Sequence, residues 1–105
     1  MAIQKKLFAI VAVSDAEKMA AKLVVEFPDT HLKVGTGQWL LVGESSMTTT
    51  EVSHKLHITS ETDTPPDDSP GTAIVLSVSN YFGRASRNIW EWITAKLGGT
   101  DIVAG

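Results

Sequence analysis

The feature that most constrains this chain is a run of seven apolar residues close to its start, Leu7-Phe8-Ala9-Ile10-Val11-Ala12-Val13. Several of them are β-branched, and an uninterrupted apolar run of this length is typical of a strand that is buried on both faces. The basic pair Lys5-Lys6 before the run resembles the start of a secretory signal, but the run has only the minimum length for one. We therefore expect a central strand, with the other elements packed as layers around it.

Length and composition point to one ordinary globular domain. With 105 residues there is room for a single core, and we expect a domain over 1–99 and a short tail, 100–105. The chain has no cysteine, which excludes disulfides and thiolate sites and fits a cytoplasmic protein. Its net charge of -3 is opposite to that of a typical nucleic-acid-binding protein. No stretch approaches the roughly 20 apolar residues of a membrane span.

Three helices are predicted. The first covers about residues 15–27, because Ser14 and Glu17 form a capping box and Pro28 ends the periodic pattern. Its apolar stripe consists of Ala16, Met19, Ala20, Leu23, Val24 and Phe27. A short second helix follows a group of three threonines, 48–50, any of which can cap it. The third covers about 85–97, with Ile89, Trp92, Ile93 and Leu97 on one stripe and Trp90 at its margin.

Three further strands complete the pattern. Residues 31–34 alternate polar and apolar, as a half-exposed edge strand does, and 38–42 are apolar on both faces. The turn Gly35-Thr36-Gly37 between them relies on the positive φ that glycine permits. Residues 72–79 form the last strand, with Ile74, Leu76 and Val78 on one face. Before it, residues 59–71 hold acids, hydroxyls and prolines but no aromatic or aliphatic side chain, which predicts a flexible acidic loop.

The predicted order of elements matches an α+β fold, the ferredoxin-like βαββαβ two-layer sandwich, with an extra C-terminal helix. In that topology the first and third strands are central, in agreement with the two runs that are apolar on both faces. Two helices then cover one face of the sheet, and an equally apolar second face needs cover from the C-terminal helix or from a second copy. We favour a homodimer. The expected interface residues are Phe8, Ile10, Trp39, Leu41, Trp90 and Trp92.

A family resemblance rests on a pattern that runs from residue 7 to residue 97. Its parts are Gly37-Gln38-Trp39-Leu40-Leu41-Val42, the threonine-rich cap and short helix, the strand at 72–79, Tyr81-Phe82-Gly83 and Ile89-Trp90-Glu91-Trp92-Ile93. Together they resemble the SinR-like proteins, small ferredoxin-like relatives of the CRISPR-associated adaptation nuclease and of VapD-type toxins. The resemblance implies dimers formed through the sheet. In some members it also implies cleavage of RNA or DNA by an aspartate at the end of the first strand with a divalent metal.

Asp15 is the residue that would take this metal-binding role. It departs from the family pattern, because it follows Ser14 and lies in the predicted capping box, where the family has a tyrosine-aspartate pair. The alternative role for Asp15 is that of an acid favoured by the dipole of the first helix.

Two other groups of residues have side chains that could bind a ligand. Arg84 and Arg87 could hold a phosphate while Tyr81 stacks on a base, although solvated arginines are the plainer reading. Glu51, His54 and His57 follow one another at a spacing of three, so neighbouring pairs could share a metal or simply face solvent. We assign no catalytic residue and no cofactor.

The leading functional hypothesis is a non-enzymatic homodimer that acts through protein–protein contacts, with a regulatory role as one version of it. The first alternative is a metal-dependent endonuclease of the resembling family, with Asp15 as metal ligand. The second alternative is an acidic inhibitor, in which the loop at 59–71 occupies a nucleic-acid-binding protein.

Overall fold

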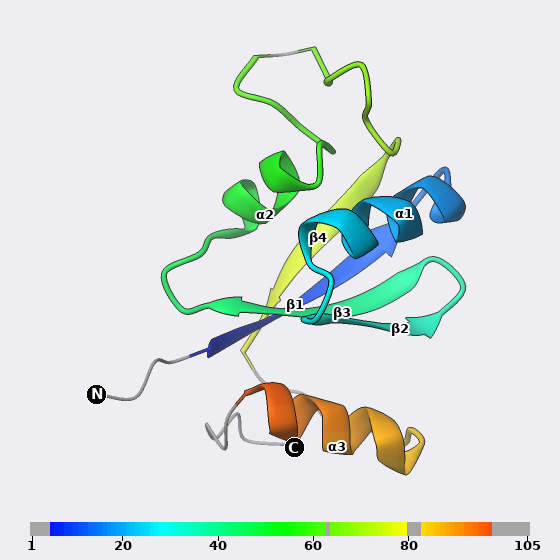
Figure 1. Cartoon of the computed structure of the whole chain (residues 1–105), viewed down its shortest axis with the longest axis vertical. Coiled ribbons are helices and arrows are strands. Elements are labelled where there is room, and N and C mark those ends of the chain that lie inside the picture. The colour runs from blue at the N-terminus through cyan, green and yellow to red at the C-terminus, as the bar shows by residue number, and fades with distance from the viewer. Residues whose placement is uncertain (1–4, 63, 80–82, 98–105) are drawn as a thin grey trace.

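The computed structural model describes residues 5–62, 64–79 and 83–97. They form a small α+β domain with a four-stranded antiparallel sheet and three helices (Figure 1). In chain order the elements are β1 (Lys5–Ala12), α1 (Ala16–Glu26), β2 (His31–Gly35), β3 (Gln38–Glu44), α2 (Thr49–Lys55), β4 (Ala73–Val78) and α3 (Arg87–Lys96). The predicted helices and strands are present, with ends that differ by one or two residues. Within the described ranges, no helix combines the length and the apolar character needed to cross a membrane.

The sheet has the strand order β2-β3-β1-β4, and neighbouring strands are antiparallel. The first and third strands are therefore central and the second and fourth are edges, as predicted. β1 lies between two partners that come from later in the chain: Leu7 is opposite Val42 of β3 and Val78 of β4. β1 and β2 run in the same direction with β3 between them, and β3 and β4 do so with β1 between them.

The larger core lies on the face of the sheet that α1 and α2 cover (Figure 1). In the register of β1 and β3, Phe8 is opposite Leu41 and Ile10 is opposite Trp39. These four side chains point toward the two helices. The buried members of this core are Phe8, Ile10, Met19, Leu23, Phe27, Trp39, Leu41, Val52, Leu56 and Ile58. The predicted stripe of α1 supplies its share of the core, except for Val24, which is 58% exposed.

The start of α1 differs from the prediction by one residue. Asp15, not Ser14, is the N-cap, and its carboxylate accepts a hydrogen bond from the backbone N–H of Lys18 at 3.1 Å. The hydroxyl of Ser14 instead accepts a hydrogen bond from the backbone N–H of Thr72 at 2.8 Å. Ser14 is therefore used to join the end of β1 to the residue that precedes β4, a partner that local spacing does not reveal.

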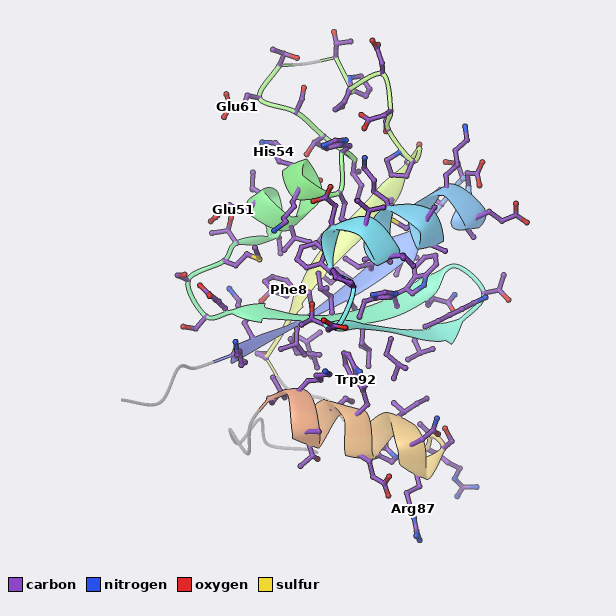
Figure 2. All side chains as sticks on the ribbon, in the orientation of Figure 1. Phe8, Glu51, His54, Glu61, Arg87 and Trp92 are labelled. Carbon is purple, nitrogen blue, oxygen red and sulfur yellow. The ribbon has the colours of Figure 1, made fainter. Side chains whose placement is uncertain are left out.

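The opposite face of the sheet is covered by α3. Leu7 of β1 and Val42 of β3 pack with Ile93 and Leu97 in a second buried cluster. The side chains partly buried around it are Leu40, Val78, Ile89, Trp90 and Trp92, and Figure 2 shows Trp92 directed from α3 toward the sheet. The sequence left open whether the C-terminal helix or a second copy covers this face. In the described chain, the C-terminal helix α3 covers it.

This arrangement corrects the expected interface. Phe8, Ile10 and Leu41 are 0% exposed and Trp39 is 2% exposed, so these four side chains belong to the core and are not available to a partner. Trp90 and Trp92 lie on α3 and are partly buried against the sheet. The apolar pattern identified residues that must be buried, but it could not say which layer would bury them.

Candidate functional site

The outer edge of β4 is the most distinctive surface of the sheet. β4 pairs with β1 on one side only, so within the described chain the backbone groups on its other side face no strand. Its six residues, Ala73–Val78, include no charge and no proline, and its register with β1 is unbroken. An edge strand with these properties is the kind to which another strand adds most readily.

Two large apolar side chains stand beside this edge. Ile74 is 52% exposed and Leu76 is 48% exposed, and both lie on the face that α3 covers elsewhere. Val78, on the same face of β4, packs against the cluster beneath α3. Just beyond the end of β1, Val13 is 61% exposed. α3 therefore leaves an apolar strip uncovered along β4, and we call Ile74 and Leu76 the β4 strip.

The other edge of the sheet is built differently. β2 carries the exposed Lys33, and its register with β3 shifts between Lys33 and Gly35. A charged side chain and an irregular register both oppose the addition of a further strand. The chain thus protects the β2 edge and leaves the β4 edge open.

The predicted turn between β2 and β3 uses the conformational freedom of one of its two glycines. Gly37 has a positive φ of 79°, whereas Gly35 ends β2.

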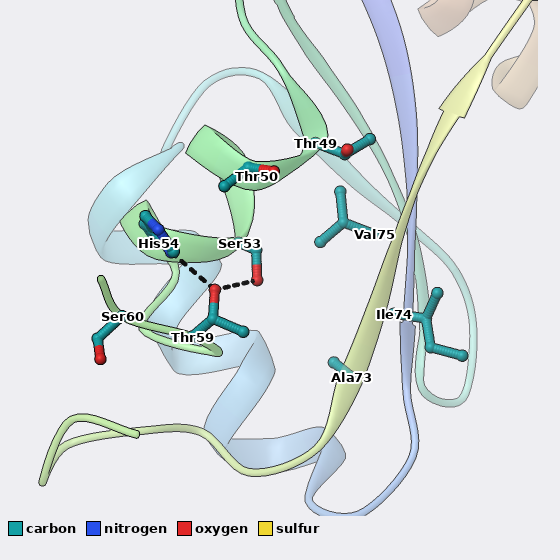
Figure 3. Close-up of a pocket in the computed structure, with 9 residues that line it drawn as sticks. All are labelled: Thr49, Thr50, Ser53, His54, Thr59, Ser60, Ala73, Ile74 and Val75. Carbon is teal, nitrogen blue, oxygen red and sulfur yellow. Dashed lines mark hydrogen bonds between the residues drawn. The ribbon is translucent and has the colours of Figure 1, made fainter. Parts of the chain in front are cut away.

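A hollow of about 500 Å³ lies between α2 and β4, next to the open edge (Figure 3). In Figure 3, Val75 points toward α2 and Ile74 points away from it. The hydroxyl of Thr59 lies 2.8 Å from the hydroxyl of Ser53 and 2.7 Å from Nδ1 of His54. Ser53 and His54 thus contact Thr59 and not each other. Among the described residues, no carboxylate forms a hydrogen bond with the His54 imidazole, so the pair of Thr59 and His54 lacks the orienting third group of a hydrolase triad.

Oppositely charged side chains meet at Asp68, on the loop that precedes β4. Oδ2 of Asp68 is 2.8 Å from Nζ of Lys22 on α1 and 2.7 Å from Nδ1 of His57, which follows α2. The hydrogen bond from Lys22, followed by that from His57, lowers the pKa of the Asp68 carboxyl. Asp68 therefore connects the acidic loop to α1 and to the turn that follows α2, so the loop has contacts that its composition did not predict.

The residues singled out as metal ligands each form a separate local contact. The carboxylate of Asp15 caps α1, Glu51 forms a capping box with Thr48 at the start of α2, and His54 and His57 contact Thr59 and Asp68 respectively. In the part of the chain that the structure describes, no three His, Asp or Glu side chains gather in a way that could hold a metal ion.

The predicted phosphate-binding arginines are both exposed. Arg84 precedes α3, and Arg87 is its first residue and points away from the sheet in Figure 2. Tyr81, the base-stacking residue of that prediction, lies outside the described residues.

Comparison with protein-family models, with curated proteins and with solved structures gives no match for this chain.

The sequence pattern placed Ile74 and Leu76 on one face of a strand but did not distinguish these exposed side chains from core residues. A usable signal was present, because a strand without charge at the edge of a sheet is unusual. No comparable signal pointed to Asp68, whose partners are far away in the sequence.

Proposed function

We propose that this protein acts through protein–protein contacts as a homodimer, in which β4 of one protomer pairs with β4 of a second copy. The observation that carries the proposal is the open, uncharged and regular edge of β4 beside the exposed Ile74 and Leu76. Antiparallel pairing about a two-fold axis would join two sheets edge to edge, and each strand would satisfy the free backbone groups of the other.

The side chains of β4 fit such a self-pairing. Ala73, Val75 and Ser77 face the side of α2, whereas Ile74, Leu76 and Val78 face the side of α3. A two-fold axis perpendicular to the sheet keeps each set on its own side. The β4 strips of the two copies then form one apolar patch, and no charged side chain of β4 enters the contact. The proposed contact is at the edge of the sheet because α3 covers much of the face that the sequence had suggested.

We also propose that the domain is a ferredoxin-like sandwich. The order βαββαβ, with α1 and α2 on one face and β1 and β3 at the centre, supports a ferredoxin-like sandwich with α3 added to its second face. The resemblance to the SinR-like proteins implies a dimer formed through the sheet, which is compatible with pairing at β4. The absence of cysteine supports a cytoplasmic location.

The test is the oligomeric state of the wild type and of Leu76→Lys, measured by sedimentation velocity across the micromolar range. We expect a wild-type mass that rises to that of a dimer with concentration. Leu76→Lys should weaken the dimer by at least about tenfold, because it brings two uncompensated charges into the contact. Val25→Lys is the matched control, since Val25 is 70% exposed on α1, away from β4. A wild type that stays monomeric throughout contradicts the proposal.

Neither alternative function gains support of its own. The nuclease hypothesis needs the Asp15 carboxylate as a metal ligand, and that carboxylate is engaged at the start of α1. The inhibitor hypothesis relies on the acidic loop, where Asp68 is already paired with Lys22, whereas Asp67 forms no hydrogen bond or ion pair within the described chain. The open edge of β4 favours pairing with a second copy over both.

A further inference from the structure

The backbone of β4 determines which of its residues a second strand can reach. In an antiparallel pair, opposite residues alternate between pairs that exchange two hydrogen bonds and pairs that exchange none. The register of β1 and β4 continues one step before β4, where the N–H of Val13 donates to the carbonyl of Thr72 at 2.8 Å. Thr72 therefore directs its carbonyl toward β1. By alternation, Ile74, Leu76 and Val78 also direct their backbone groups toward β1.

The hydrogen bonds of β1 on its other side agree with this alternation. The N–H of Ala12 donates at 2.8 Å to the carbonyl of Gly37, just before β3, so Ala12 lies opposite Ala73 without exchanging bonds with it. Ala73, Val75 and Ser77 thus point their N–H and carbonyl groups outward from the open edge. No turn, cap or side-chain hydrogen bond within the described chain uses these outward groups.

We infer that the two copies pair in one register, with the two-fold axis at Val75. The inference rests on the proposed homodimer and states how its two β4 strands meet. Because outward residues must meet outward residues to exchange hydrogen bonds, the axis passes through a residue and not between two. With the axis at Val75, Val75 meets its own copy and Ala73 meets Ser77, so every outward residue of β4 is paired. An axis at Ile74 or Leu76 would leave one outward residue opposite a residue outside β4.

The exposed side chains fit the same register. Ile74 of one copy lies opposite Leu76 of the other, and each is about half exposed in the single copy. They form a pair without hydrogen bonds, in which the Cα atoms are only about 4.5 Å apart, so the two side chains cover one another. By symmetry the same pair occurs on both sides of the axis. On the other face of β4, Ala73 meets Ser77 and Val75 meets its own copy, and none of these side chains carries a charge.

Pairing in this register uses the open edge of each copy completely. The joined sheet is then bounded at both ends by β2, whose exposed Lys33 and shifted register with β3 oppose the addition of a further strand. Assembly therefore ends at two copies and does not continue into an open chain of sheets.

The chain has no cysteine, so introduced thiols can report the register. Ile74→Cys and Leu76→Cys are oxidised with diamide, each alone and as an equimolar mixture, at a concentration where the wild type is a dimer. Opposite residues are within reach of a disulfide, whereas each of these residues and its own copy lie on a diagonal, about 7–8 Å apart. We expect the mixture to form disulfide-linked dimers roughly tenfold faster than either variant alone, because Cα atoms farther apart than about 7 Å need backbone movement to be bridged.

A mixture of Leu76→Cys with Val25→Cys is the matched control, since Val25 is exposed on α1 and reports random collision. Fastest crosslinking by Ile74→Cys alone or by Leu76→Cys alone would place the axis at that residue. Either result would overturn the register and leave pairing through β4 intact. If the first mixture is no faster than the control while the protein still sediments as a dimer, the contact lies elsewhere, and the register is overturned. A wild type that sediments as a monomer contradicts the proposed function itself, whatever the thiols do.

Discussion

The two faces of the sheet are covered to different extents. On one face, α1 and α2 together enclose the larger buried core, which runs from Phe8 to Ile58. On the other, α3 alone covers a smaller cluster around Leu7 and leaves a crevice of about 310 Å³ between itself and the sheet. A helix with its side chains is about 10 Å wide, whereas four strands spaced about 4.8 Å apart are wider than that. One helix cannot cover such a sheet, and this explains why Ile74 and Leu76 remain exposed.

The helices also differ at their starts. Asp15 caps α1 and Thr48 caps α2, each with a side-chain hydrogen bond to the backbone. Ser86, the N-cap of α3, makes no such bond, and its hydroxyl donates to the side chain of Asn88 instead. The layer formed by α1 and α2 is therefore fixed both by its core and by its caps. α3 lacks such a cap, so we expect it to separate from the sheet first.

The largest expected losses of folding free energy come from one substitution in each of the two cores, and they test whether the two faces of the sheet unfold independently. Phe8→Ala should lower the free energy of unfolding by about 3–5 kcal/mol, because it leaves a large cavity in the main core. Ile93→Ala should lower it by about 2 kcal/mol, since Ile93 already borders the crevice. In Ile93→Ala the near-ultraviolet circular dichroism should lose the contribution of Trp90 and Trp92 before the far-ultraviolet signal changes. A single coincident transition in both variants would show that the faces form one cooperative unit.

The caps give the next largest effect. Asp15→Ala should destabilise the domain by about 1 kcal/mol, because the backbone N–H of Lys18 loses its acceptor. Ser86→Ala should change stability by less than about 0.5 kcal/mol, since Ser86 provides no cap. Urea unfolding of the two variants measures both values. Similar losses in the two variants would remove the contrast between α1 and α3.

Filling the crevice should reduce the difference between the faces. Ala85 lines the crevice, so Ala85→Leu should raise the free energy of unfolding by about 0.5–1 kcal/mol through added apolar burial. Ala95→Leu on α3 is the control, because Ala95 is exposed and does not line the crevice. The comparison is made by thermal unfolding. Equal changes in the two variants would mean that the crevice is too open to shelter a side chain.

The smallest expected effect is on the stability of the domain at low pH. The pKa of Asp68 lies below its ordinary value of 3.8 in the folded protein, so the unfolded chain binds the proton more readily. The stability that this carboxylate contributes is therefore present above that value and is lost as the pH falls through the folded pKa. Asp68→Asn should lose less stability than the wild type between pH 7 and pH 3, whereas Asp67→Asn should behave like the wild type. Thermal unfolding at the two pH values measures the difference.

The parts of this molecule that sequence predicts are the ones that local pattern determines. The apolar runs and helical stripes identified the elements, and the contrast between the runs at 7–13 and 31–34 identified central and edge strands. Sequence failed wherever the partner is distant. Ser14 was expected to cap α1 but contacts Thr72, and Asp68 was assigned to a free loop but meets Lys22. The exposure of Ile74 follows from the width of α3, which no local pattern expresses.

The place of β1 between β3 and β4 has a consequence for synthesis. The ribosome releases β1 first, yet the strand on one of its sides cannot form until Val78 has been translated. Until then the most apolar segment of the nascent chain has an open side, and non-local pairing of this kind is slow. We therefore expect β1 to complete its pairing only after β4 has been synthesised.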